Sequence, residues 1–456
     1  MNSERTDTRE KLPEPQSPAP ETAAEAAPAD ILVASPDEKN PAAPSDGADS
    51  AFLTPGQLMV RRFFKEKTAV YGLVFVILLF AAAMSAPLFV NGKPLLIISG
   101  LDVSSPALRD FFAPDAQEVF VEKLFNWLFL ATLATSILYA CLRKHKMVFR
   151  FVLPAVLILL AIPFCTIKSR MDRENWRSKA QKEKYDFAQV RLGQLNSHHQ
   201  FRVPKKYVFA LVPYGPFEKA PDNNYAKPSW EHPFGTDGIG RDVFARMIYG
   251  ARVSLAVGFL ATALELMLGT MIGLFSGYRG GRVDLIVQRL VEIVICFPTF
   301  LLLLILMTFM RESGAQQSIL LVIFVLGMTG WPGLSRLVRG EVLKARQMAY
   351  IQSCESLGVP LHSILFRHLL PNVSGPIFVS FAFSIAGFIL AENSLSFLGF
   401  GVQPPSASWG ELLNQAFPNP LRYWNLILWP GLAIFLCVTA FNFIADGIRR
   451  SIDLKS

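Results

Sequence analysis

Long runs of apolar residues, separated by shorter polar stretches, dominate the pattern of the chain. Each run is long enough, as a helix, to cross the roughly 30 Å hydrocarbon layer of a bilayer. The pattern therefore predicts an all-α polytopic membrane protein with about eight transmembrane helices. The runs are residues 68–90, 124–142, 147–167, 251–278, 285–310, 318–334, 370–390 and 425–444.

Basic residues at the ends of these runs predict the direction of the chain. Arg61, Arg62 and Lys65 lie directly before the first run, so the positive-inside rule places the N-terminus in the cytoplasm. An even number of spans returns the C-terminus to the same side, in agreement with Arg449 and Arg450 after the last run. We expect a multi-pass protein of the cytoplasmic (inner) membrane of a prokaryote, with both termini cytoplasmic.

Three regions are expected along the chain. Residues 1–50 are rich in Pro, Ala, Glu and Ser and lack apolar periodicity, which is typical of a disordered, here cytoplasmic, tail. Residues 51–231 contain three spans and a charged segment that begins at residue 168. We expect an external lobe there, because loops longer than ~60 residues translocate regardless of their charge. Residues 232–456 contain the other five spans.

Composition supports a membrane protein and excludes several other classes. The chain is 52% hydrophobic and only 18% charged. Its net charge of +8 comes from basic residues beside the apolar runs, so no nucleic-acid partner is expected. The five cysteines lack metal-ligand spacing, and neither a phosphate-binding loop nor another catalytic motif is present. We therefore expect no bound metal, no cofactor and no enzymatic activity.

A polar stretch at residues 346–372 lies between two of the runs and predicts two short helices on either side of Gly358. Pro360 begins the second helix and Pro371 is expected to end it. The stretch resembles the coupling loop of ABC-importer permeases, which binds the ATPase subunit. The family pattern of Glu-Ala-Ala, Gly and a later Leu-Pro is partly kept. The residues placed in this loop are Gln352, Ser353, Cys354, Gly358, Pro360, Arg367, Leu370 and Pro371.

Residues 232–255 begin as a turn and continue as an amphipathic helix, which could lie in the membrane interface. The polar rim of this helix is expected to be Arg241, Asp242, Arg246 and Arg252. As a single residue, Asp237 is more typical of a turn or a cap than of a ligand. The string nevertheless resembles the entry motif of dipeptide and oligopeptide importer permeases, C-type subunit. The residues that carry it are Gly235, Thr236, Asp237, Gly240, Arg241 and Asp242.

Acidic residues within apolar runs are candidates for a translocation path, because such residues usually face protein or a wet cavity. They are Glu265, Glu292 and Glu392. For Glu292 a structural alternative is an ion pair with Arg289 that holds two helices together. In the same run as Glu292, Pro298 is expected to kink its helix.

Residues 392–413 cannot form a continuous helix, because they contain two glycines and two prolines. They resemble a segment of the same permeases and are expected to form an outer mouth where a substrate-delivering protein docks. A plain re-entrant connection is the alternative. Trp409, like Trp424 and Trp429, is interpreted as an interfacial anchor. The residues assigned to the outer mouth are Gly399, Gly401, Pro404, Pro405 and Trp409.

The resemblance covers residues 232–456 and, more weakly, the first span. It implies a type I ABC-importer permease core of the dipeptide, oligopeptide and nickel class. This chain differs by its N-terminal extension and by two spans inserted after the first. The implied partners are a homologous permease, two ATPase subunits and an external binding protein. Together they would move peptides, nickel chelates or similar small polar solutes by ATP-driven alternating access.

Two alternatives remain open from the residues. The chain could be a secondary transporter that couples ions through Glu265 and Glu292, or a membrane scaffold that does not transport.

Overall fold

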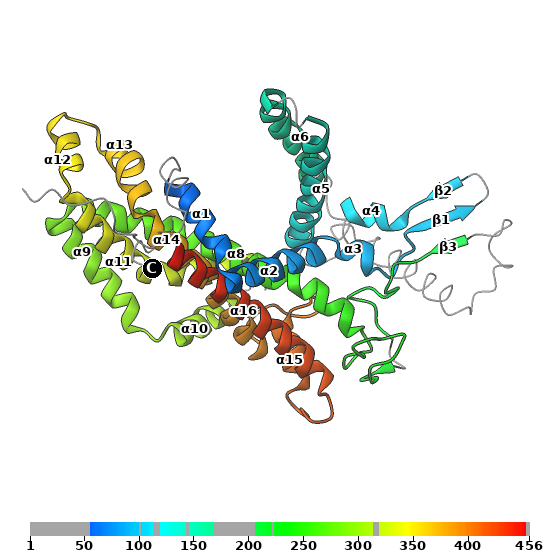
Figure 1. Ribbon diagram of the computed structural model, residues 1–456. Coiled ribbons are helices and arrows are strands. Elements are labelled where there is room, and N and C mark those ends of the chain that lie inside the picture. The colour runs from blue at the N-terminus through cyan, green and yellow to red at the C-terminus, as the bar shows by residue number, and fades with distance from the viewer. Residues whose placement is uncertain are drawn as a thin grey trace, which may run out of the picture. The chain divides into compact units, whose positions relative to one another are not determined.

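The computed structural model describes residues 55–99, 102–112, 119–142, 146–166, 206–220, 223–312 and 319–452. The predicted tail, residues 1–50, and most of the charged segment after residue 168 lie outside the described residues. The described chain is predominantly helical, which confirms the predicted fold class (Figure 1).

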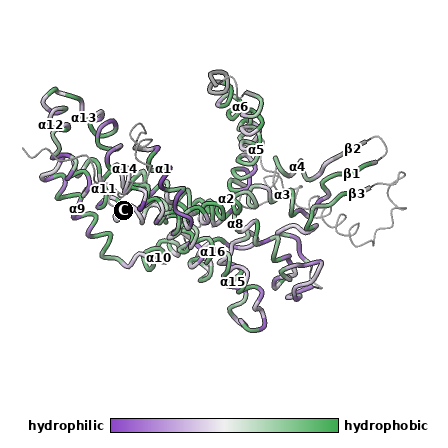
Figure 2. The backbone as a smooth tube through the Cα atoms, viewed as in Figure 1, coloured by the Kyte–Doolittle hydropathy of each residue, from purple (hydrophilic) through white to green (hydrophobic). Residues whose placement is uncertain are grey.

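The described residues of all eight predicted apolar runs are mainly helical. Among the described residues, six helices are long and apolar enough to cross a membrane, and a bent pair could supply a seventh span. The helix of the third run, α6 (Lys146–Thr166), has a shorter apolar part, Val152–Pro163. The six are α2 (Lys67–Met84), α5 (Val119–Leu142), α8 (Val243–Arg279), α11 (Ile319–Arg346), α14 (Leu370–Phe397) and α16 (Asn425–Ile452). Hydrophobic residues predominate along the middle of α2, α8 and α16 (Figure 2).

Helix α8 packs closely against α11 along a row of glycines. Gly269, Gly273 and Gly277 follow one another at four-residue spacing and so share one face of α8. A Cβ atom added to Gly273 would lie 2.7 Å from the Ser335 carbonyl oxygen, which leaves no room for a side chain. Such small-residue seams let membrane helices approach each other through van der Waals contact. The pair α8 and α11 forms the centre of the fold.

The predicted kink at Pro298 is confirmed, and it divides the run into two helices. Helix α9 (Gly281–Cys296) ends before this proline and α10 (Thr299–Glu312) begins after it, with an angle of 82° between the two helices. Proline cannot donate a backbone hydrogen bond and its ring clashes with the preceding turn, which explains the break. The run at residues 285–310 is therefore two helices.

The inserted region contains elements that the hydropathy pattern did not predict. Three short antiparallel strands pair in the order β2–β1–β3, with bounds Leu96–Ser99 for β1, Asp102–Ser104 for β2 and Lys206–Val208 for β3. Val103 faces Ile98, and Tyr207 faces Ile97, across the two ladders. Strands of this length are too short to give an alternating pattern. The sheet joins residues from the start and the end of the insertion.

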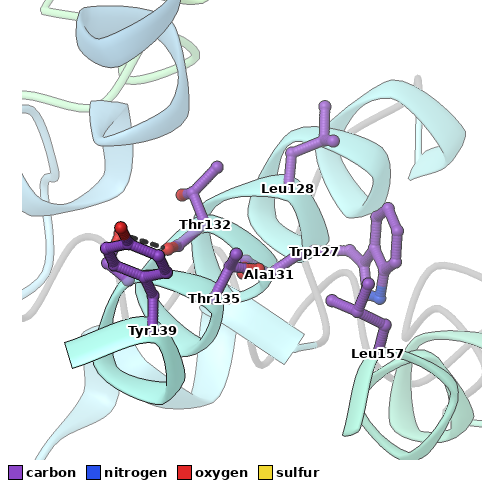
Figure 3. A pocket seen from close by; sticks show the side chains of 8 residues that line it. Trp127, Leu128, Ala131, Thr132, Thr135, Tyr139 and Leu157 are labelled. Atoms are coloured by element: carbon purple, nitrogen blue, oxygen red, sulfur yellow. Dashed lines mark hydrogen bonds between the residues drawn. The ribbon is translucent and has the colours of Figure 1, made fainter. Parts of the chain in front are cut away.

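Helices α5 and α6 form a hairpin (Figure 1) with a groove of about 430 Å³ between them. Figure 3 shows Trp127 of α5 beside Leu157 of α6 at one end of this groove. The hydroxyls of Thr132, Thr135 and Ser136 donate to carbonyl groups of α5 itself. The groove wall therefore presents mainly apolar surface.

The remaining elements are α1 (Pro55–Lys65), α3 (Ala86–Phe89), α4 (Pro106–Phe112), α12 (Ala349–Ser356), α13 (Leu361–Ser363), the π-helix η4 (Ile364–Leu369) and α15 (Trp409–Ala416).

Candidate functional site

The loop before α8 is held by a buried cluster of two arginines and two acids. The Asp237 carboxylate accepts a hydrogen bond from Nε of Arg241 at 2.6 Å and lies 3.5 Å from Nε of Arg246. Nη2 of Arg246 donates to Oε2 of Glu411 on α15 at 2.5 Å. None of the four side chains is more than 7% exposed. The cluster joins the loop before α8, α8 itself and α15.

The prediction that polar residues between 241 and 252 form the rim of an interfacial helix is wrong. Asp242 is the N-cap of α8 and accepts the Ala245 N–H at 2.7 Å, and its other oxygen lies 2.8 Å from Nδ1 of His232. Arg241, Arg246 and Arg252 are buried against other elements, and the helix runs without interruption to Arg279. The alternation that resembled an amphipathic surface helix instead reflects ion pairs made inside the protein.

The other entry-motif residues shape the turn that carries this cluster. Gly235 and Gly240 have φ angles of 78° and 76°, which favour glycine. At Gly240 a Cβ atom would lie 1.8 Å from the Ala220 carbonyl oxygen. The hydroxyl of Thr236 accepts the Ala226 N–H at 2.8 Å. All six motif residues thus have structural roles in this chain, and Asp237 acts as the turn residue that its type favours.

Glu392 joins three segments at the far end of α14. Its carboxylate accepts hydrogen bonds from Ser254 of α8 at 3.2 Å, from Ser396 at 2.7 Å and from Ser408 at 2.8 Å. The side chain is completely buried. Within this chain Glu392 therefore holds α8, α14 and the loop before α15 together, and does not line an open path.

The segment after α14 is irregular, as its glycines and prolines predict. Gly399 has a φ of 81°, and the Pro404–Pro405 peptide bond is cis. Trp409 is only 1% exposed and its indole Nε1 donates to the Met247 carbonyl at 2.9 Å. The interpretation of Trp409 as an interfacial anchor is therefore wrong. The segment folds back onto α8.

Gly401 and Gly399 offer a matched pair for a test. In Gly401→Ala the new Cβ would lie 2.2 Å from Oγ and 2.6 Å from the backbone N of Ser396. We expect a loss of about 1–3 kcal/mol in the free energy of unfolding, because an overpacked site must shift. Gly399→Asn should lose much less, since nothing lies within 4 Å and asparagine tolerates positive φ. Thermal unfolding of both purified variants in detergent checks this, and equal losses would contradict it.

The two other membrane acids have different environments. Glu265 is buried beside Gly330 of α11 and interacts with Ser384 of α14, while its Oε2 has no hydrogen-bond partner among the residues that the structure describes. Glu292 pairs with Arg289 at 2.7 Å, but both residues lie on α9 and both are exposed. The expected pair exists, yet it does not hold two helices together.

The pair that joins α9 to a neighbouring helix was missed. Nε and Nη2 of Arg339 on α11 each lie 2.5 Å from one oxygen of Asp284. No local pattern indicates this bidentate pair, because its members are 55 positions apart.

Two short helices around Gly358 are confirmed. Helix α12 ends at Ser356, and the N–H groups of Gly358 and Val359 donate to the carbonyls of Glu355 and Cys354 at 3.1 and 3.0 Å. This is a Schellman ending, and the φ of 70° at Gly358 is the left-handed conformation that it needs. Pro360 is the N-cap of α13, so the turn is defined from both sides.

The expectation that Pro371 ends the second helix is wrong. The backbone stays helical from α13 through η4 into α14, and Pro371 lies in the first turn of α14. The Leu370 N–H bonds the Leu365 carbonyl, a wider π-type turn that absorbs the proline without a break. We call residues 349–369, from α12 to η4, the two-helix unit.

The two-helix unit (yellow in Figure 1) is anchored by apolar contacts and exposes its polar side. Ile351, Ile364 and Leu369 are buried against residues of α8 and α11. Gln352, Ser353 and Arg367 are exposed, and Leu357 beside the turn is 82% exposed. Cys354 and Leu370 are half-buried. An exposed leucine amid polar groups on a fixed turn is typical of a surface that contacts another protein.

The fold and these segments define a multi-pass helical membrane protein. Residues 269–455 match the family described as binding-protein-dependent transport system inner membrane component, and residues 54–97 match the N-terminal TM domain of oligopeptide transport permease C. A dipeptide transport system permease protein of Bacillus subtilis is 36% identical over 257 residues, which cover 55% of this chain and 79% of the relative. The chain belongs to this family of ABC-importer permeases, as its motifs predict.

Two further sequence relatives agree with this assignment, and one solved structure is similar in part. A glutathione transport system permease protein of Pectobacterium atrosepticum is 40% identical over 228 residues, covering 50% of this chain and 74% of the relative. An oligopeptide transport system permease protein of Bacillus subtilis is 37% identical over 231 residues, covering 50% and 73%. A chain of the MetNI methionine ABC transporter, solved in inward-facing conformations, aligns with 46% of this chain and 96% of its own at 16% identity and a TM-score of 0.38.

Proposed function

We propose that this chain is the permease subunit of an ATP-driven importer that moves peptides, or a similar small polar solute, by alternating access. The observation that carries the proposal is the two-helix unit, which offers an exposed polar surface on a rigid turn between α11 and α14. The names of the relatives above support peptides as cargo. The chain itself is expected to hydrolyse no ATP and to hold no metal or cofactor.

The two-helix unit is suited to transmit movement from an ATPase subunit. Its buried residues belong to one apolar cluster with Leu274 of α8 and Val342 of α11. Because η4 continues directly into α14, a displacement of the unit would move α14 along its axis. A partner that binds the two ATP-dependent conformations differently would shift the permease between two states by that difference.

An apolar face of α9 and α10 supports a second permease subunit as partner. Leu285, Ile286, Leu290 and Ile293 on α9, and Ile305 on α10, are each more than half exposed in this single chain. A partner helix or lipid would have to cover them. The opposite end of α14, with its irregular loop, would then receive an external binding protein. In this arrangement both termini lie in the cytoplasm.

Substitution of Gly358 tests the proposal. In Gly358→Pro the required φ changes sign, from 70° to about −65°, and the N–H that bonds Glu355 is lost. We expect loss of the co-purifying ATPase, or ATP hydrolysis that no longer depends on the cargo. Gly358→Asn is the control, because asparagine tolerates the left-handed conformation and should retain the complex. If no ATPase co-purifies with the unmodified chain under gentle extraction, the proposal fails.

A second candidate is ion-coupled transport, which is favoured by Oε2 of Glu265, a buried oxygen with no hydrogen-bond partner in the described part of the chain. Glu292 gives it no support, since its carboxylate is exposed and paired with Arg289. Uptake by the reconstituted complex separates the two. If a proton or sodium uncoupler abolishes uptake, and uptake requires no ATP, the result would favour Glu265 as a coupling site.

A further inference from the structure

The loop before α8 and the segment after α14 enclose a second pocket, of about 400 Å³, which we call the loop pocket. Its wall comes from four segments, represented by Tyr225, Arg241, Gln403 and Asn414. The pocket lies at the end of α14 opposite the two-helix unit, since η4 precedes α14 and Gly399, which also lines the pocket, follows it. A volume of this size accommodates one side chain or a small ligand.

The floor of the loop pocket is held by ion pairs, and its charges are neutralised. Arg241 lines the pocket, but its Nε is bound to Asp237 at 2.6 Å and its Nη2 lies 3.6 Å from Glu411. Arg246 neutralises the other oxygen of Glu411 from beneath. Two cations therefore face two anions in the same cluster. An anionic ligand would find no uncommitted cation on this floor.

The amide side chains of the wall are oriented by backbone acceptors. Nε2 of Gln403 donates to the Gly399 carbonyl at 2.7 Å, and Nδ2 of Asn414 donates to the Phe397 carbonyl at 2.5 Å. Because a carbonyl acceptor must face the NH₂ group, the amide oxygens of both residues point away from these bonds. Neither oxygen accepts a hydrogen bond within the part of the chain that the structure describes. The wall thus offers the amide oxygens of Gln403 and Asn414 as acceptors, beside the committed cation of Arg241.

Apolar and aromatic side chains surround these acceptors. Tyr225 lines the pocket and stacks on Tyr423 with ring centroids 3.8 Å apart. Ile239, also in the wall, is 40% exposed, and Phe417 next to α15 is 70% exposed. Aromatic faces attract cations, so the Tyr225 side chain suits a cationic ligand.

We propose that the loop pocket receives a lysine or arginine side chain of the external substrate-delivering protein. This inference rests on the proposed function, which requires such a protein. The acceptor oxygens of Gln403 and Asn414 bind the N–H groups of that side chain, and the Tyr225 ring packs against its aliphatic stem. The pocket thereby fixes the register in which the partner docks.

Charge substitutions at Gln403 test this directly. The sample is the complex of the chain with its permease and ATPase partners in lipid nanodiscs, and the probe is the substrate-binding protein that the proposed function requires. Gln403→Lys keeps a donor for the Gly399 carbonyl, but replaces the acceptor with a like charge. We expect Kd for the binding protein to rise at least about tenfold, with a smaller change at high salt. Asn224→Lys adds the same charge on an exposed residue outside the pocket and should change Kd less than about twofold.

A second measurement uses a small probe. Millimolar N-acetylarginine amide should compete with the binding protein, whereas N-acetylglutamate amide should not. Unchanged or tighter binding by Gln403→Lys, or equal weakening by Asn224→Lys, would overturn the inference. So would direct binding of free cargo peptide to the pocket with docking unaffected, which would make it a substrate subsite. If the unmodified complex recruits no binding protein, the proposed function itself fails, and that result is distinct from the others.

Discussion

Arg246→Ala is expected to destabilise the protein by about 3–5 kcal/mol, because it leaves buried carboxylates without their cation. Oε2 of Glu411 would lose its partner at 2.5 Å, and Arg241 would be left as the cation for both Asp237 and Glu411 in this cluster. The guanidinium also donates to the Pro216 and Pro405 carbonyls, so several loops lose a common anchor. Thermal unfolding in detergent, followed by tryptophan fluorescence, measures the loss.

Two further variants isolate the cause at this position. Arg246→Lys keeps the charge but not the planar donor fork, so its loss should be intermediate. Arg289→Ala removes an arginine whose partner Glu292 is also exposed, and should change stability by less than about 1 kcal/mol. Arg246→Ala with stability close to that of Arg289→Ala would show that the cluster does not hold the loops.

The elements that could be predicted from the sequence are those determined by residues close together in the chain. Gly358 ends α12 because its own conformation and the next two residues form the turn, and Pro298 separates α9 from α10 through its own ring. Apolar run length likewise located the helices. The errors concern polar residues. Arg252 and Trp409 looked like surface groups because their buried partners lie 130 or more positions away.

In the candidate site, too, features set by neighbouring residues were predicted and contacts between distant residues were not. The sequence located the entry motif and the segment after α14 as separate signals, and nothing in either pattern indicated that they share a pocket. Glu411 links them, yet it resembles an ordinary acid in the first turn of a short helix. Pairing across about 160 positions is decided by packing of α8 against α15, which local periodicity does not encode.

A buried arginine links the inserted hairpin to the family core, beside apolar contacts of Val121 and Phe125. Arg252 of α8 pairs with Glu122 of α5, and its Nε and Nη2 donate to the carbonyls of Ala83 and Met84 at 2.6 and 3.2 Å. Those carbonyls belong to the last turn of α2, and the last C=O groups of a helix have no N–H partner within it. The guanidinium carbon also lies 5.7 Å from the Phe125 ring centroid. One side chain thus binds the first span, the insertion and the core.

Glu122→Ala is therefore expected to lower the free energy of unfolding by about 3–5 kcal/mol, because Arg252 stays buried without its counter-ion. Glu66→Ala removes an exposed acid, 3.3 Å from Arg450, and should lose less than about 1 kcal/mol. The double variant Glu122→Leu/Arg252→Met replaces the pair with apolar side chains and should recover much of the loss.

Hydrogen exchange locates the effect of Glu122→Ala, because we expect amide exchange to become faster in α5 than in α14. Exchange that is equally faster in α5 and α14 of the variant would show that the hairpin does not depend on this pair. Exchange in α5 as slow as in the unmodified protein would instead assign the attachment of the hairpin to the apolar contacts around Phe125.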